Sequence, residues 1–218
     1  MGDNRIAKYA SIGLLTILLV STVIAASGTV NVLMLPDLSD WDTKKFSGET
    51  SYELVDIDDR PAIKAVSNSS ASGMIREIKV DLTKTPYLNW SWKVDSTLGD
   101  LDETKKSGDD YAARVYVVIS GGIFFWRTRA INYTWASVHP KGSSWPNAYT
   151  GNVIMVAVES GQEHVGQWVA QKRNVLEDLK TLHGIDKTHI DAVAIMTDTD
   201  NSNRSAIAFY GDIYFTED

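Results

Sequence analysis

Oxygen-bearing side chains are concentrated in one short stretch near the C-terminus, "TDTDNSN" at residues 197–203. It contains Asp198 and Asp200 together with two asparagines. Calcium is bound in proteins by about six to eight oxygens from carboxylates, amides and backbone carbonyls, so the donors are suitable. The stretch lacks the glycine and the distant glutamate of an EF-hand loop, and Asp and Asn also satisfy the backbone of plain turns. We therefore expect a turn first and a calcium site second.

A partly covered arginine is predicted in "DYAARVYVVI" at residues 110–119. The alternation predicts a strand with one apolar face, which places Asp110 and Arg114 on the opposite face. A partly covered arginine needs an anion nearby. If this strand pairs with the next segment, Arg129 and Trp135 could join the same surface. The alternative is a structural ion-pair cluster, which ordinary sandwiches also contain.

Aromatic residues are the next candidates, because the chain has seven tryptophans. Indole and phenol rings stack on the C–H faces of sugars, while polar groups fix the ligand's orientation. Trp135, Trp145 and Tyr149 are close in the sequence, and Trp145 lies in a polar loop at residues 139–152. A tryptophan in such a loop indicates a stacking surface. The alternative for Trp145 is that it folds back and caps the core.

Catalysis has weaker support from the residue pattern. The four histidines show no metal-ligand spacing, and the chain has no nucleophile elbow, phosphate-binding loop or dinucleotide fingerprint. Asp110 and Glu159 lie at predicted strand ends, so a carboxylate pair for glycoside hydrolysis is imaginable. The alternative is that these acids belong to a solvated rim of the sheet.

The elements that must position these residues are short strands separated by turns. β-branched and aromatic residues alternate through most of the chain from residue 51 onward, and residues 173–184 give the one convincing helix. The predicted fold is mainly β: an antiparallel β-sandwich of the jelly-roll type with one helical insert.

Composition limits the function classes. The chain of 218 residues is 44 % hydrophobic with a net charge of −7, so a packed core is expected and nucleic acid is not an expected partner. Cysteine is absent, which excludes disulfides and thiolate metal ligands.

The N-terminal segment, residues 1–27, has Arg5 and Lys8, then an apolar run, then small residues. This order is typical of a secretory signal, and an uncleaved anchor is the alternative. We expect residues 28–40 to be a linker and residues 41–218 to form the β-sandwich domain. The folded part is then periplasmic or secreted, with membrane contact only through an uncleaved N-terminal segment.

Several blocks occur together and in order, among them "TPYLNWSWKVD", "SGDDYAARVYVVI", "NAYTGNVIMVAVESG" and "IMTDTDNS". From about residue 54 to 215 the chain resembles the bacterial domain-of-unknown-function 3047 family, which implies an exported bacterial protein and no established activity. More loosely it is similar to galactose-binding-like jelly rolls, which include many carbohydrate-binding modules. In such modules a carboxylate on the last strand often ligates a structural calcium, and by this resemblance Asp212 occupies that place. The alternative is an outward-facing acid on an ordinary edge strand.

The sequence therefore favours a non-catalytic, exported binding domain for a saccharide or another small polar ligand of the envelope. The expected stacking surfaces are Trp135, Trp145 and Tyr149, and the expected orienting groups are Arg114, Arg129 and Asp110. The one cofactor considered is a structural calcium, with Asp212 ahead of Asp198 and Asp200. Two alternatives stay open: a hydrolase of envelope glycans that uses Asp110 and Glu159, and a structural or protein-interaction domain.

Overall fold

The computed structural model describes residues 28–123 and 125–218. The predicted leader, residues 1–27, lies outside this part of the chain. Within the described part, no helix combines the length and the apolar composition needed to cross a membrane.

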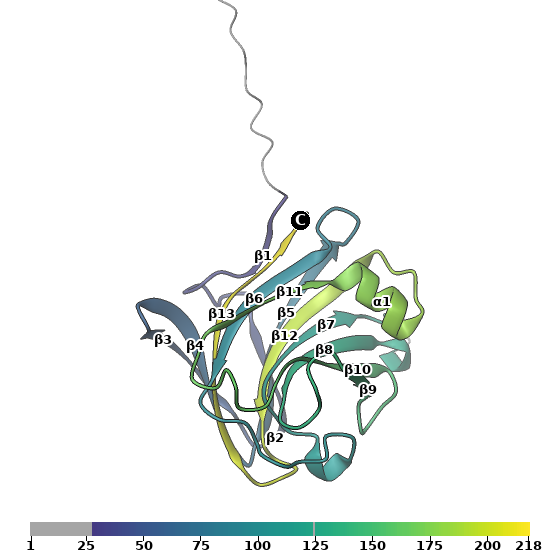
Figure 1. Cartoon of the computed structure of the whole chain (residues 1–218). Coiled ribbons are helices and arrows are strands. Elements are labelled where there is room, and N and C mark those ends of the chain that lie inside the picture. The colour runs from purple at the N-terminus through teal and green to yellow at the C-terminus, as the bar shows by residue number, and fades with distance from the viewer. Residues whose placement is uncertain (1–27, 124) are drawn as a thin grey trace, which may run out of the picture.

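Two sheets pack against each other as the layers of a sandwich (Figure 1). The six-stranded sheet has the order β11 (Val169–Asn174), β6 (Tyr87–Val94), β13 (Ser205–Thr216), β4 (Arg60–Asn68) and β3 (Ser51–Ile57), with β1 (Val30–Leu33) also on β13. The seven-stranded sheet has the order β2 (Asp42–Ser47), β5 (Ala71–Asp81), β12 (His189–Asp198), β7 (Tyr111–Ile119), β8 (Arg129–Ala136), β10 (Val153–Ser160) and β9 (Ser144–Pro146).

The strand order identifies a jelly roll. The chain runs from β4 to β5, β6 and β7, changing sheet at each step, and the last two strands then insert between earlier ones. The result is a β4–β13–β6–β11 layer on a β5–β12–β7–β8 layer, the two Greek keys of a jelly roll. The predicted fold class is confirmed. Most neighbouring strands are antiparallel, whereas β8 and β10 run parallel.

The stretch that we expected to be a linker, residues 28–40, contributes a strand to the sandwich. β1 pairs with β13, with Val30 opposite Phe215, and both Val32 and Leu33 are completely buried. Four residues are too few to show an alternation that the sequence alone would reveal, so this strand was missed.

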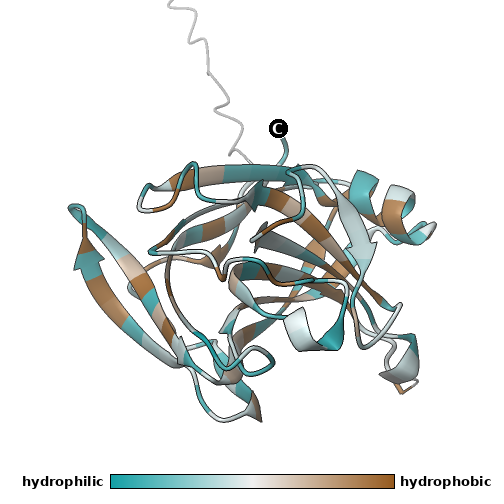
Figure 2. Cartoon of the chain, turned by 60° about the horizontal axis from the view of Figure 1, so that its bottom comes forward, coloured by the Kyte–Doolittle hydropathy of each residue, from teal (hydrophilic) through white to brown (hydrophobic). Residues whose placement is uncertain are grey.

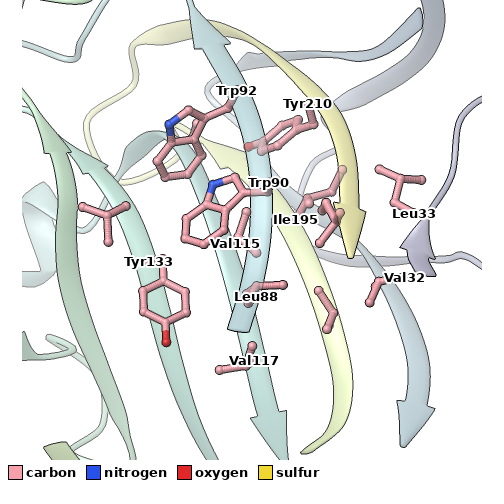
Figure 3. Packing of buried hydrophobic residues seen from close by; sticks show 14 of the residues in the cluster. Val32, Leu33, Leu88, Trp90, Trp92, Val115, Val117, Tyr133, Ile195 and Tyr210 are labelled. Carbon is pink, nitrogen blue, oxygen red and sulfur yellow. The ribbon is translucent and has the colours of Figure 1, made fainter. Parts of the chain in front are cut away.

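Alternation along the strands explains the core. Apolar and polar bands succeed one another along the ribbons in Figure 2, as expected where one face of a strand is buried and the other is not. Figure 3 shows Trp90 and Trp92 between the layers, with Tyr133 beside them. The two indole rings meet edge to face with centroids 5.5 Å apart, and the Trp90 and Tyr133 ring centroids are 5.4 Å apart. The aromatic residues of β6 and β8 therefore fill the space between the sheets.

The predicted helix is confirmed as α1 (Val175–His183). The Asn174 side chain accepts a hydrogen bond from the backbone N–H of Glu177, which satisfies a free donor of the first turn. Gly184 ends the helix in the left-handed conformation, with φ of 62°. Two short 3₁₀ helices, η1 (Lys106–Gly108) and η2 (Phe125–Arg127), lie in the connections around β7.

Candidate ligand-binding cavity

The outer face of the seven-stranded sheet carries several buried charged side chains. In β7, Ala113, Val115 and Val117 point into the core, so Arg114 and Tyr116 must lie on the opposite face. This face points away from the six-stranded sheet. It is here that the structure has a cavity of about 360 Å³, which we call the outer cavity. The cavity is lined by Phe46, Ser47, Ala71, Asp109, Arg114, Tyr116, Asn147, Tyr149, Val153, Met196, Asp198, Asp200 and Asn201.

An ion pair between Arg114 and Asp198 forms the polar floor of the outer cavity. The two residues come from neighbouring strands, β7 and β12, and are only 4 % and 1 % exposed. Burial raises the pKa of Asp198 well above its usual range, and the nearby charges of Asp110 and Asp109 add to this rise while Arg114 opposes it. A charge pair is costly to bury unless its remaining polar atoms are also satisfied.

Two atoms of this pair are not satisfied. The Nε atom of Arg114 and the Oδ1 atom of Asp198 are both buried and have no hydrogen-bond partner. One is a donor and the other is an acceptor. Buried polar atoms without partners are uncommon in native proteins and cost free energy, so they indicate a place where a ligand atom completes the network.

Tyr149 forms the rim of the outer cavity. Its side chain is 55 % exposed, its hydroxyl donates a hydrogen bond to Asn201 Oδ1, and the Lys106 ammonium lies 5.0 Å from its ring centroid. The backbone N–H of Tyr149 donates to Asn147 Oδ1 at 3.0 Å, which fixes the loop. On the other side Phe46 is 63 % exposed. The cavity therefore combines exposed rings with a buried charged floor.

A second buried acid, Asp109, lies in the wall. Both of its carboxylate oxygens accept hydrogen bonds from the Asn147 side-chain amide at 2.9 Å. Burial raises the pKa of Asp109, and Arg114 and the Asn147 hydrogen bond counteract that effect. The amide thus holds the carboxylate in one orientation.

The outer cavity continues along the sheet. A hollow of about 220 Å³ shares Phe46, Tyr116 and Met196 with it, and a further hollow of about 520 Å³ shares Ile75 and Val118 with the second. Along β12, the residues in these hollows run from Asp198 to Asp191. Seven steps along a strand span more than about 20 Å, so the whole depression is elongated.

Three carboxylates meet at one end of the outer cavity. Asp110, Asp198 and Asp200, which we call the acidic cluster, each offer an oxygen within 4.8 Å of the others. Asp110 and Asp198 are buried and Asp200 is half-buried. Asp198 lies opposite Tyr111 in the β12–β7 register, so Asp110 is beside it. The sequence singled out all three residues without showing that they are neighbours.

The two tryptophans expected to stack on a ligand are buried. Trp135 is 1 % exposed and belongs to the main core, where its indole N–H donates to the carbonyl of Gly161. Trp145 is 7 % exposed and its indole N–H donates to the carbonyl of Glu103. Neither ring is available to a ligand, because Trp135 faces the main core and Trp145 packs with Tyr111 and Met155 in a second apolar cluster. For Trp145 this is the core-capping alternative.

The remaining sequence candidates lie apart from the outer cavity. Arg129 is opposite Ile119, at the far end of the hairpin from Arg114, about 17 Å along the strand. Glu159 contacts Lys141 at 3.0 Å and His164 at 3.3 Å and does not line the cavity, so it forms no acid pair with Asp110 there.

Asp212, the leading calcium candidate from the sequence, is exposed. Its Oδ1 accepts a hydrogen bond from the backbone N–H of Leu35 at 3.1 Å. Asp212 does lie beside the segment around Leu35, as expected for the last strand of a jelly roll. Among the described residues, however, it belongs to no group of three acidic or histidine side chains that could hold a metal. Asp198, by contrast, belongs to the acidic cluster.

Nine of the thirteen residues that line the outer cavity were not predicted as site residues. The period of two in β7 places Tyr116 on the same face as Arg114, so this residue had a local signal. Asp109 is the neighbour of Asp110. Phe46, Asn147 and Met196 had no such signal, because only strand order brings them to this face.

Comparison with known proteins adds the family. The model of a family described as "Protein of unknown function (DUF3047)" matches residues 39–214. The chain belongs to this family. No functionally curated protein matches this DUF3047 chain.

Solved structures similar to this family member include three domains that bind or act on carbohydrates. One is the family 11 carbohydrate-binding module of the cellulosomal cellulase Lic26A-Cel5E of Clostridium thermocellum, which is 11 % identical with a TM-score of 0.48, covering 88 % of this chain and 96 % of that one. The xyloglucanase domain of NopAA from Sinorhizobium fredii, in complex with cellobiose, is 10 % identical with a TM-score of 0.44, covering 88 % and 98 %. The carbohydrate recognition domain of Emp47p is 10 % identical with a TM-score of 0.44, covering 88 % and 96 %.

Proposed function

We propose that this DUF3047 protein is an exported, non-catalytic binding domain and that its ligand is a saccharide chain held in the outer cavity. The observation that carries the proposal is the floor of the cavity. There, Arg114 Nε and Asp198 Oδ1 are a buried donor and a buried acceptor without partners. A hydroxyl group both accepts and donates, so neighbouring sugar hydroxyls match this pair.

The rim supplies the apolar contact that a sugar needs. Tyr149 is exposed beside the charged floor, and its ring is held by the hydrogen bond to Asn201. The face of its ring can cover the C–H face of one sugar unit while Arg114 and Asp198 in the floor form hydrogen bonds with the hydroxyl groups. Tyr149 is the one predicted stacking residue that the structure leaves accessible.

The shape favours a chain over a single unit. The outer cavity and the two hollows that continue it extend along β12 for about 20 Å. Exposed or half-buried apolar side chains, including Phe46 and Val118, line this path. A longer oligosaccharide therefore contacts more of the surface than a short one does.

The test is binding of the purified full chain to an array of envelope and plant oligosaccharides, followed by titration calorimetry on a length series. We expect Kd to fall as units are added until the depression is filled. Tyr149→Ala should weaken binding of the best ligand by at least about tenfold, the equivalent of one stacking contact of about 1.4 kcal/mol.

Tyr214→Ala is the matched control, because Tyr214 is also exposed but belongs to β13 in the other sheet. It should bind as the unaltered protein does. The proposal fails if no saccharide binds, or if Tyr149→Ala and Tyr214→Ala have equal affinities.

A further inference from the structure

The acidic cluster gathers more negative charge than its surroundings neutralise. Asp110, Asp198 and Asp200 lie around one point, and Asp109 is close enough to act on Asp198 electrostatically. Arg114 provides the opposing positive charge. One guanidinium against four carboxylates leaves an excess of negative charge in a largely buried place, which is unfavourable without a further cation or a bound proton.

Asp198 also has a free ligand atom. Its Oδ2 accepts the hydrogen bond from Arg114, whereas its Oδ1 is buried with no partner, although the residue is only 1 % exposed. Close by, the Ser202 hydroxyl is likewise buried without a partner, and the Ser202 backbone N–H donates to Asp110 Oδ2 at 2.6 Å. Two unsatisfied oxygens therefore flank the same cluster, independently of its charge.

The remaining hydrogen bonds hold the cluster in shape. Asp110 Oδ1 accepts from the backbone N–H of Asn201 at 3.1 Å and from its side-chain amide at 3.2 Å. The same amide donates to Asp200 Oδ1 at 3.1 Å. The turn after β12 is thus tied to the start of β7 before any ion binds, so the three carboxylates are already close together.

We infer that Asp110, Asp198 and Asp200 bind a divalent cation, calcium, at the end of the outer cavity. The donors of the cluster are carboxylate oxygens, with serine and amide oxygens beside them, and such hard ligands suit calcium. Zinc prefers nitrogen and sulfur, and the acidic cluster contains neither histidine nor cysteine. The ion balances the excess charge and satisfies Asp198 Oδ1. The saccharide proposal above uses the same Asp198 oxygen, so the calcium titration is done without saccharide, and the two proposals can then fail separately.

The test is isothermal titration of the chelator-stripped full chain with calcium chloride, paired with thermal melting in calcium and in chelator. We expect one binding event and a higher melting temperature in calcium, because an ion that binds only the folded state stabilises it. Asp200→Asn removes one charged ligand from a half-buried position and keeps the side-chain shape. Changes at residues that only hydrogen-bond to the metal ligands already weaken metal affinity by about 10- to 100-fold, so Asp200→Asn should weaken it by at least about tenfold.

Asp212→Asn is the matched control, an acid-to-amide change at an exposed position outside the cluster. It should bind calcium as the unaltered chain does. The inference is overturned if the unaltered chain binds no calcium and melts equally in calcium and chelator. It is also overturned if Asp212→Asn weakens binding as much as Asp200→Asn does.

Discussion

Trp145 and Tyr149 are four residues apart, yet the structure gives them opposite roles, which can be separated by mutation. Trp145 is 7 % exposed and packs with Tyr111 and Met155 in a small apolar cluster. Its indole also stacks on the His139 ring, with centroids 4.1 Å apart, and donates to the Glu103 carbonyl at 3.3 Å. Trp145→Ala therefore removes a buried ring together with a hydrogen bond.

The expected cost of Trp145→Ala is about 3–5 kcal/mol in the free energy of unfolding, the range for deletion of a buried aromatic side chain. In a chain of this size 1 kcal/mol corresponds to about 2–4 °C, so the melting temperature should fall by about 6–20 °C. Tyr149→Ala leaves no buried cavity behind, because the Tyr149 side chain is 55 % exposed. It should change the free energy of unfolding by no more than about 0.5–1 kcal/mol.

Urea denaturation followed by tryptophan fluorescence and circular dichroism measures both variants against the unaltered chain. Saccharide titration under native conditions completes the comparison: Tyr149→Ala should lose affinity, whereas folded Trp145→Ala should retain most of it. If Trp145→Ala unfolds at the same urea concentration as the unaltered protein, the ring is not a core residue. The assignment of the two aromatic residues would then be wrong.

Three other predictions concern the ion pair, the pH dependence and the leader. Arg114→Met should lower the free energy of unfolding by about 3–5 kcal/mol, because Asp198 stays buried without its counter-charge. Adding Asp198→Leu should restore part of this loss, as measured by urea denaturation. A double variant no more stable than the single variant would contradict the argument. Burial lowers the pKa of His183 below 6.5, so its contribution to stability is complete above that pH and is lost as the pH falls through its pKa in the folded state. Between pH 8 and pH 5 the melting temperature of His183→Gln should therefore fall less than that of the unaltered chain. Equal falls in melting temperature would count against this prediction. N-terminal sequencing of a periplasmic fraction should find a mature start between residues 27 and 29, and a full-length cytoplasmic product would contradict export.

Local patterns predicted the strands around Arg114 and the helix correctly but missed β1, and which strands are neighbours was harder to predict. Alternation in residues 110–119 placed Arg114 opposite the apolar face, which the structure confirms, and Gly184 marked the end of the helix. Both signals are contained in a few consecutive residues. The pairing of β7 with β12 joins segments about 80 residues apart, and nothing local to Arg114 indicates Asp198 as its partner.

The same distinction explains the errors. Trp145 lies in a polar stretch of sequence, so its surroundings indicated exposure, but pairing of β9 with β10 turns it onto the second apolar cluster. Asp212 was placed by analogy with other jelly rolls, whereas the acidic residues that do meet were brought together by strand order. A sequence describes what a side chain is and which face of its strand it occupies. Which strand lies beside it depends on the topology of the whole sheet.

The position of β13 has a consequence for how this chain reaches its native state. The C-terminal strand lies in the middle of the six-stranded sheet, where it pairs with β4, β6 and β1. Until β13 is available, β4 and β6 have no strand to join them, and the layer cannot close. Non-local pairing of this kind makes folding slow. The sandwich is therefore complete only once β13 is in place, and removal of this strand should abolish folding of the entire domain.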